Sequence, residues 1–309
     1  MSDTTARRLD DVTAARSRIA AHLVGREREL ELALAAVASG RDLILEGPPG
    51  TSKTTMLKAI TEEWGIPLVF VEGNADLTPA KLVGHHNPAR VLREDYSAEN
   101  FVPGPLAQAM REGGFLYIEE FNRAPEDTLN TLLTAMADRA IEVPRVGRIQ
   151  ALPTFRVIAS MNPYDNVGTT RLSMSVSDRL NRIVVDYQDA PAEERIVALR
   201  TGLAGEVADR LIPDVVAVTR ATRVHPDVRQ GSSVRGAIDC VLVVNELARL
   251  RGLQGSGDER YAEAVYDGML VALSGRIRVD EAAETTPERV LREIWEDRFI
   301  LEPATAAPG

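Results

Sequence analysis

Short apolar runs recur along the first two-thirds of the chain, and segments with helical spacing separate them. We predict strands at residues 43–45, 68–71, 115–118, 155–159 and 183–185. We predict helices at residues 27–37, 54–63, 106–111 and 126–140. Strands that alternate with helices are typical of a parallel sheet covered by helices. The pattern therefore predicts an α/β fold for this part of the chain.

One short segment and the last third depart from this alternation. Residues 141–149 alternate in polarity and turn near Gly147, which predicts a hairpin, although Pro144 weakens one of its strands. From about residue 189 no convincing strand follows, and Pro191 is typical of the first turn of a helix. We therefore predict an all-helical second domain. The expected divisions are an N-terminal extension at 1–21, partly helical or disordered, an α/β core at 22–188, a helical domain at 189–301 and a disordered tail at 302–309.

A segment rich in glycine and proline follows the first predicted strand. It reads Gly47-Pro48-Pro49-Gly50-Thr51-Ser52-Lys53-Thr54-Thr55 and nearly matches the phosphate-binding pattern Gly-x4-Gly-Lys-Ser/Thr. In such a loop, backbone N–H groups and a helix N-terminus surround the phosphates. Lys53 would reach the β- and γ-phosphates, and the Thr54 hydroxyl would ligate Mg²⁺. Ser52 replaces the second glycine, and a left-handed conformation there would cost roughly 1 kcal/mol.

The third predicted strand ends in two carboxylates, Glu119 and Glu120. This is the Walker B arrangement, in which the first acid orients the Mg²⁺ shell and the second polarises the attacking water. The usual first acid is aspartate, so Glu119 carries its carboxylate one methylene further out. Together with the phosphate loop, the pair predicts a nucleotide-hydrolysing site.

The composition narrows the classes of partner. The net charge is −10, from 36 basic and 46 acidic residues, which argues against electrostatic binding to nucleic acid or to an anionic membrane. The single cysteine, Cys240, lies in an apolar run and is expected to be a buried thiol. No apolar stretch is long enough to span a membrane, and the N-terminus lacks the apolar core of a signal peptide. We therefore expect a cytoplasmic protein.

Several segments, in order, resemble the MoxR-type AAA+ ATPases, the helix-2-insert group with a dynein-related AAA domain. The segment from Glu119 to Pro125 is similar to the family pattern Asp-Glu-Ile-Asn-Arg-Ala-Pro. The other matching segments are Val24-Gly25-Arg26-Glu27 beside the adenine, residues 74–84 and 101–106 around the helix-2 insert, Ser160-Met161-Asn162-Pro163 as sensor 1, Ser177-Asp178-Arg179-Leu180 as the arginine-finger segment, and Gly231-Ser232-Ser233-Val234-Arg235 as sensor 2. The resemblance implies a P-loop NTPase with a three-layer core and an all-helical lid.

The resemblance also implies roles for single residues. Asn162 would hydrogen-bond the attacking water or the γ-phosphate; alternatively it is a turn residue before Pro163. Arg179 would be the finger that reaches the γ-phosphate of a neighbouring subunit; alternatively it forms a surface ion pair with Asp178 or a nearby acid. Arg123 is a second candidate for the finger.

Four further residues carry weaker signals. Arg182 follows the finger segment closely enough to substitute for Arg179. Arg235 would join the lid to the nucleotide; alternatively it is an ordinary exposed charge on a helix. His85 and His86 are adjacent, do not share a helix face and have no cysteine or acid cluster near them. We therefore interpret both histidines as surface residues and not as metal ligands.

The motifs together predict an ATP hydrolase that requires Mg²⁺. Because a finger comes from the next subunit, we expect a homo-oligomeric ring, a hexamer by the resemblance, that remodels a client protein. The resemblance suggests maturation of a metalloenzyme or partnership with a von Willebrand A-domain protein. Two alternatives remain. Ser52 and Glu119 depart from consensus and would fit a nucleotide-gated scaffold with little turnover. The Asn-Arg-Ala stretch also resembles McrB-type GTPases, which would imply a nucleic-acid-associated NTPase.

Overall fold

The structure is a computed structural model that describes residues 12–90, 98–163, 172–255 and 257–301. The disorder expected at residues 1–8 and 302–309 falls outside this description. The chain forms two compact units, Met1–Pro48 with Ser52–Asp186, and Pro49–Thr51 with Tyr187–Gly309.

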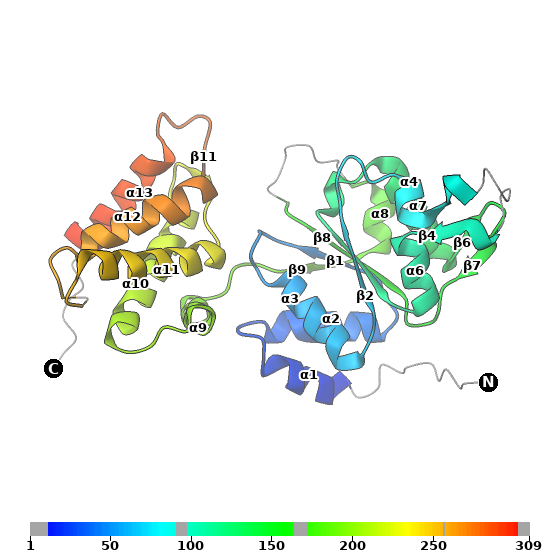
Figure 1. Ribbon diagram of the computed structural model, residues 1–309, viewed down its shortest axis with the longest axis horizontal. Coiled ribbons are helices and arrows are strands. Elements are labelled where there is room, and N and C mark those ends of the chain that lie inside the picture. The colour runs from blue at the N-terminus through cyan, green and yellow to red at the C-terminus, as the bar shows by residue number, and fades with distance from the viewer. Residues whose placement is uncertain (1–11, 91–97, 164–171, 256, 302–309) are drawn as a thin grey trace. The chain divides into compact units, whose positions relative to one another are not determined.

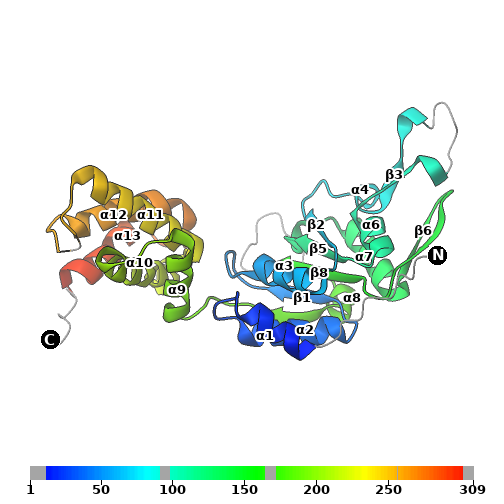
Figure 2. The same ribbon diagram turned by 60° about the horizontal axis from the view of Figure 1, so that its bottom comes forward.

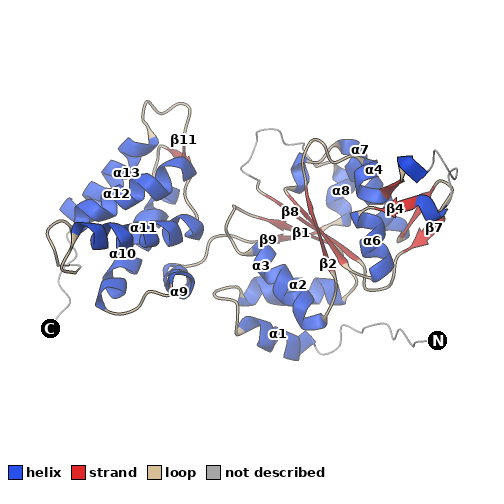
Figure 3. Ribbon diagram, viewed as in Figure 1, coloured by secondary structure: helices blue, strands red, loops and turns tan. Residues whose placement is uncertain are grey.

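A five-stranded parallel sheet forms the centre of the first unit (Figures 1 and 3). Its strand order is β2-β5-β8-β1-β9. The strands are β1 (Leu43–Glu46), β2 (Leu68–Glu72), β5 (Phe115–Glu119), β8 (Arg156–Met161) and β9 (Asn181–Val184). These positions confirm the five predicted strands and the α/β fold class. The register pairs Glu72 with Glu119 and Glu46 with Met161, so the carboxyl ends of neighbouring strands lie at one edge.

Helices cover both faces of this sheet and make it a three-layer unit, as Figure 1 shows. On one face, Leu43, Leu45 and Tyr117 share a core with three helices. On the other face, Ile44, Ile118 and further strand residues pack against the remaining helices. The helices are α1 (Val12–Ala20), α2 (Glu27–Ala38) and α3 (Lys53–Trp64) on the first face, with α4 (Pro79–Val83), α6 (Pro105–Glu112), α7 (Glu126–Asp138) and α8 (Met174–Arg179) on the second side.

Two hairpins extend from the core on the side of α4, α6 and α7 (Figure 2). The first pairs β3 (Gly84–His86) with β4 (Phe101–Pro103), and the sequence did not predict these strands. The second pairs β6 (Ala140–Val143) with β7 (Gly147–Gln150), which confirms the hairpin predicted at 141–149. Pro144 does not weaken a strand, as we had expected, because it lies in the turn between the two strands.

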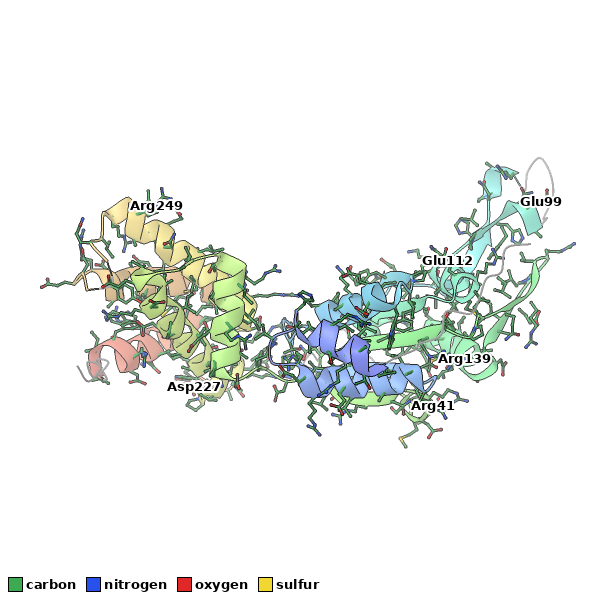
Figure 4. All side chains as sticks on the ribbon, turned by 90° about the horizontal axis from the view of Figure 1, so that it is seen from below. Arg41, Glu99, Glu112, Arg139, Asp227 and Arg249 are labelled. Carbon is green, nitrogen blue, oxygen red and sulfur yellow. The ribbon has the colours of Figure 1, made fainter. Side chains whose placement is uncertain are left out.

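A buried ion pair ties the start of β1 to the end of α7. Asp42 is 4% exposed and accepts hydrogen bonds from Arg139 at 2.7 Å and 3.0 Å and from the Val157 backbone N–H at 2.8 Å. Arg139 is labelled in Figure 4. Burial raises the pKa of Asp42, although these donors oppose the shift. The pair fixes the sheet edge opposite the strand ends that carry the predicted site.

The second unit is mainly helical and has its own apolar core. Its helices are α9 (Ala190–Thr201), α10 (Glu206–Val224), α11 (Val234–Arg251), α12 (Tyr261–Leu273) and α13 (Pro287–Glu296). The expectation of an all-helical domain is wrong in one detail, because β10 (Val228–Gln230) pairs with β11 (Arg278–Val279). Cys240 lies in the core, as predicted, and its pKa is raised to about 12 by burial. Among the described helices, none has the length and apolar composition needed to span a membrane.

Candidate functional site

The predicted phosphate loop begins where β1 ends. A Cβ on Gly47 would lie 2.0 Å from the Val185 carbonyl oxygen, so this position admits only glycine. The Gly47 N–H donates to the Met161 carbonyl at 3.1 Å, which ties the loop to the end of β8. Gly50 has φ +76°, a left-handed conformation that glycine adopts without strain. The backbone therefore favours glycine at both positions, at Gly47 because there is no room for a side chain and at Gly50 because of its left-handed conformation.

Ser52 and Lys53 mark the transition from the loop to α3. Ser52 has φ +66° and ψ +16°, so it adopts the left-handed conformation of the glycine that it replaces. Lys53 is the first residue of α3, and its ammonium donates to the carbonyls of Gly47 at 2.9 Å and Pro48 at 2.7 Å. The lysine cation thus lies within the loop whose phosphate-binding role it is expected to complete.

Thr54 and Glu119, the two predicted metal ligands, lie together. The Thr54 hydroxyl donates to Glu119 Oε1 at 3.1 Å, although the residues are on α3 and β5. A hydroxyl and a carboxylate are hard oxygen ligands, which Mg²⁺ prefers, and Mg²⁺ completes its shell with water and phosphate oxygens. The donor set therefore fits Mg²⁺. Among the described residues, no cluster of three or more His, Cys, Asp or Glu side chains could hold a metal ion.

Sequence reasoning missed two hydroxyl groups beside this pair. The Tyr117 hydroxyl lies 2.9 Å from Ser160 Oγ and 3.1 Å from Thr54 Oγ1. Tyr117 is fully buried and Ser160 is 1% exposed. Strand alternation could have placed Tyr117 on the same face as Glu119, because side chains two residues apart share a face. The partners on α3 and β8 come from tertiary packing and leave no local signal.

Glu120, the predicted base, follows the strand in an unusual conformation. Its φ of +52° places it in the left-handed region, and its Oε2 lies 3.1 Å from Arg123 Nε. Gly73 makes room for this turn, because a Cβ there would lie 2.4 Å from the Glu120 carbonyl oxygen. Arg123, the second finger candidate, therefore pairs with the base of its own subunit.

The other predicted residues lie at the same end of the sheet or beyond it. Asn162 directly follows β8 and is half-buried. Arg179 ends α8, is exposed and donates to the Ser175 carbonyl at 3.1 Å. Among the described residues Arg179 has no carboxylate partner, and Asp178 does not pair with it. Arg182 instead forms an ion pair with Glu46.

Four further residues that the sequence singles out belong to other elements. Arg235 is exposed near the start of α11 in the second unit. Arg26 is 3% exposed, bonds Glu29 at 2.9 Å and donates to the Asp186 carbonyl at 2.5 Å. His85 is exposed on β3, and the ring of His86 packs edge-on against Phe101 at 5.5 Å.

Comparisons with known proteins agree with this geometry. Residues 42–180 match the family described as "AAA domain (dynein-related subfamily)". The gas vesicle ATPase GvpN of Ancylobacter aquaticus is 31% identical over 265 residues, which cover 80% of this chain and 70% of that protein. Gas vesicle ATPase GvpN1 of Halobacterium salinarum is 28% identical over 269 residues, 76% of each chain. RuvB of Thermotoga maritima, a Holliday junction branch migration motor, shares the fold with a TM-score of 0.51 at 20% identity, over 80% of this chain and 70% of that chain.

Proposed function

The chain belongs to the MoxR-like AAA+ ATPases with a dynein-related AAA domain, and from this premise we propose that it hydrolyses Mg²⁺-ATP in an oligomeric ring to remodel a client protein. The observation that carries the proposal is the contact between Thr54 and Glu119 at 3.1 Å. It brings the phosphate loop and the acidic strand end together with a donor set that suits Mg²⁺.

Residues of the first unit have separate proposed roles in phosphoryl transfer. The backbone N–H groups of residues 50–55 and the Lys53 ammonium bind the phosphates. Thr54 and Glu119 would hold Mg²⁺, which would supply positive charge that neutralises the phosphate oxygens. Glu120 accepts a proton from the attacking water, and Asn162 orients that water or the γ-phosphate.

Three arginines have proposed roles between subunits or between the lid and the nucleotide. Arg179 is exposed and has no carboxylate partner among the described residues, which suits a finger offered to a neighbouring subunit. Arg123 is the second candidate for the finger, because it forms an ion pair with Glu120 of its own subunit. Arg235, on the helical second unit, reports the nucleotide state to the lid. A ring follows from a finger that acts in trans, and a hexamer is the proposed stoichiometry.

The client is proposed from the relatives and from the family resemblance. Two relatives are gas vesicle ATPases, so a gas vesicle protein is one client to test. A von Willebrand A-domain protein or a metalloenzyme is the other class, from the family resemblance. The test is whether the purified candidate stimulates ATP turnover. Denatured albumin is the control, and a specific client should stimulate turnover more than albumin does.

The turnover test uses two substitutions with matched controls. Glu120→Gln removes the base and should lower ATP hydrolysis about 10²–10⁴-fold while ATP still binds. Lys53→Ala should weaken ATP binding itself, as measured by calorimetry with Mg²⁺. The exposed residues Glu126 and Lys58 supply the controls Glu126→Gln and Lys58→Ala. Hydrolysis by Glu120→Gln at the parent rate would mean that another group activates the water.

The two rival functions are tested with the same protein. Glu119→Asp should change turnover by less than about tenfold, or about 1.4 kcal/mol in the barrier. A much larger gain would favour a slow, nucleotide-gated scaffold. A preference for GTP, or stimulation by DNA, would favour the McrB-like alternative.

A further inference from the structure

Three oxygen-bearing side chains, each from a different element, meet around the Tyr117 hydroxyl. Ser160 Oγ lies 2.9 Å from it, Thr54 Oγ1 3.1 Å and Glu119 Oε1 3.5 Å. The bond between Thr54 and Glu119 closes the group. Tyr117 belongs to β5, Thr54 to α3 and Ser160 to β8. One buried phenol therefore joins the phosphate-loop helix to two strands that end at the candidate site.

The number of hydroxyl protons limits which of these side chains donate and which accept. The Glu119 carboxylate can only accept, and Thr54 donates its single hydroxyl proton to it. An oxygen lone pair of Thr54 is then free to face a cation. Tyr117 supplies one proton to Thr54, Glu119 or Ser160. A phenol is protonated at neutral pH, so Tyr117 is a donor there.

The ring of Tyr117 is itself fixed. The side chain has no exposed surface and packs edge-on against Phe70 with ring centroids 5.7 Å apart. Its hydroxyl therefore has a defined position relative to β5. A donor held in this way restricts the carboxylate of Glu119, whose extra methylene gives it one more rotatable bond than aspartate.

We propose that the Tyr117 hydroxyl is a positioning group for the magnesium ligands: it donates to the Thr54 hydroxyl, which donates in turn to the Glu119 carboxylate, and it accepts from Ser160, so that both ligands are fixed relative to β8. The proposal rests on the proposed function, since it assumes that Thr54 and Glu119 hold Mg²⁺ with a nucleotide. Ser160 is its anchor on β8, and Asn162 follows two residues later on the same strand end. Tyr117 acts through the ligands and touches no substrate.

The test measures metal-dependent nucleotide affinity rather than turnover. In full-length protein carrying Glu120→Gln, ATP binding is measured by calorimetry without Mg²⁺ and over a Mg²⁺ titration. Tyr117→Phe removes one oxygen atom and keeps the ring. Loss of a group that orients metal ligands typically lowers metal affinity about 10–100-fold. We expect a loss of this size in the Mg²⁺ titration and an unchanged affinity for ATP without metal.

A matched control and a second variant keep the test decisive. Tyr261→Phe also deletes a buried phenol hydroxyl, one bonded to Asp214 at 3.1 Å in the second unit, and should leave the Mg²⁺ titration unchanged. Ser160→Ala removes the anchor and leaves the Tyr117 ring in place, so it replaces Tyr117→Phe if that variant unfolds. Thermal unfolding checks each variant.

A comparison of glutamate with aspartate at position 119 gives a further test. Glu119→Asp withdraws the carboxylate from Tyr117, so Tyr117→Phe should cost less Mg²⁺ affinity in that background than in the parent. An additive double mutant would mean that the residues do not interact. An unchanged Mg²⁺ titration in folded Tyr117→Phe and Ser160→Ala overturns the inference, as does an equal loss with and without metal. A parent protein that binds no ATP at all contradicts the proposed function instead.

Discussion

At the scale of single residues, Ser52 shows how a departure from the glycine of the phosphate-loop pattern is accommodated. Its φ of +66° costs a residue with a Cβ about 1–2 kcal/mol relative to a right-handed conformation. A glycine there would avoid the strain but would lose about 0.5–1 kcal/mol through its freer unfolded chain. The two effects are similar in size, so the serine is tolerated.

We predict that Ser52→Gly leaves ATP affinity within about tenfold of the parent, because a strain change of about 1 kcal/mol cannot do more. Calorimetry measures the affinity, and chemical denaturation measures stability. Ser39→Gly is the control, because Ser39 has φ −80° and no strain to relieve, so it should destabilise the protein. A gain of hundredfold in affinity at Ser52→Gly would show that the loop is not already formed.

The sequence predicted the chemical identities at the site better than their contacts. Thr54 and Glu119 were assigned to one metal, and they lie 3.1 Å apart. Spacing along the chain could not show that Tyr117 and Ser160 join them, since these contacts depend on how α3 and β8 pack. It also could not show that Arg123 pairs with Glu120, because the left-handed turn at Glu120 decides where both side chains point.

At the scale of elements, a buried glutamate organises the start of the second unit. Glu193 of α9 is 1% exposed and bonds Arg223 of α10 at 2.7 Å and Arg220 at 3.3 Å. Arg223 also donates to the Ser232 carbonyl at 2.7 Å and lies 3.9 Å from the ring of Tyr187. Through Arg223, α9 and α10 thus hold the segment that leads into α11 and Arg235.

We predict that Glu193→Gln destabilises the second unit by up to about 3–5 kcal/mol, because removing one partner leaves buried arginine charge without compensation. Denaturation of the full chain, followed by the reactivity of buried Cys240, measures the effect on this unit. Glu194→Gln is the control, because Glu194 is the next residue and has no ion pair among those described. Equal stability of the two variants would mean that solvent compensates the charge.

Element prediction succeeded where the apolar pattern was long and failed where strands were short. The five sheet strands are four to six residues long, the three central ones β1, β5 and β8 are mostly buried, and alternation with helices identified all five. Strands β10 and β11 have three and two residues, too few for a period of two to appear. Pro144 was placed in a strand because turn and strand residues overlap in composition, whereas the structure places it in the turn.

At the scale of the whole molecule, the surface around α8 suits an interface between subunits. Arg179 is exposed, while Arg182, the residue that could have substituted for it, is engaged by Glu46 of the same chain. Arg123 is likewise engaged by Glu120. Of these three arginines, Arg179 is the one without a carboxylate partner among the described residues, which is the reason we propose it as the finger.

We predict that Arg179→Ala leaves ATP binding nearly intact and lowers hydrolysis strongly, since arginine fingers contribute about 10³–10⁵ in phosphoryl transfer. Steady-state turnover and calorimetry measure the two quantities. Arg41→Ala, which removes an exposed arginine of the same unit, should retain activity and serves as the control.

Mixing two inactive proteins tests the trans geometry directly. An Arg179→Ala subunit keeps the base but lacks the finger, and a Glu120→Gln subunit keeps the finger but lacks the base. In an equal random mixture, about a quarter of the head-to-tail interfaces join an intact base to an intact finger. We therefore expect mixed rings to recover part of the parent turnover. Mixed rings that are verified by mass and stay inactive would show that Arg179 acts within its own subunit. The same mixing with Arg123→Ala in place of Arg179→Ala would then test Arg123 as the finger. Arg123 would have to leave its ion pair with Glu120 before it could reach a neighbouring subunit.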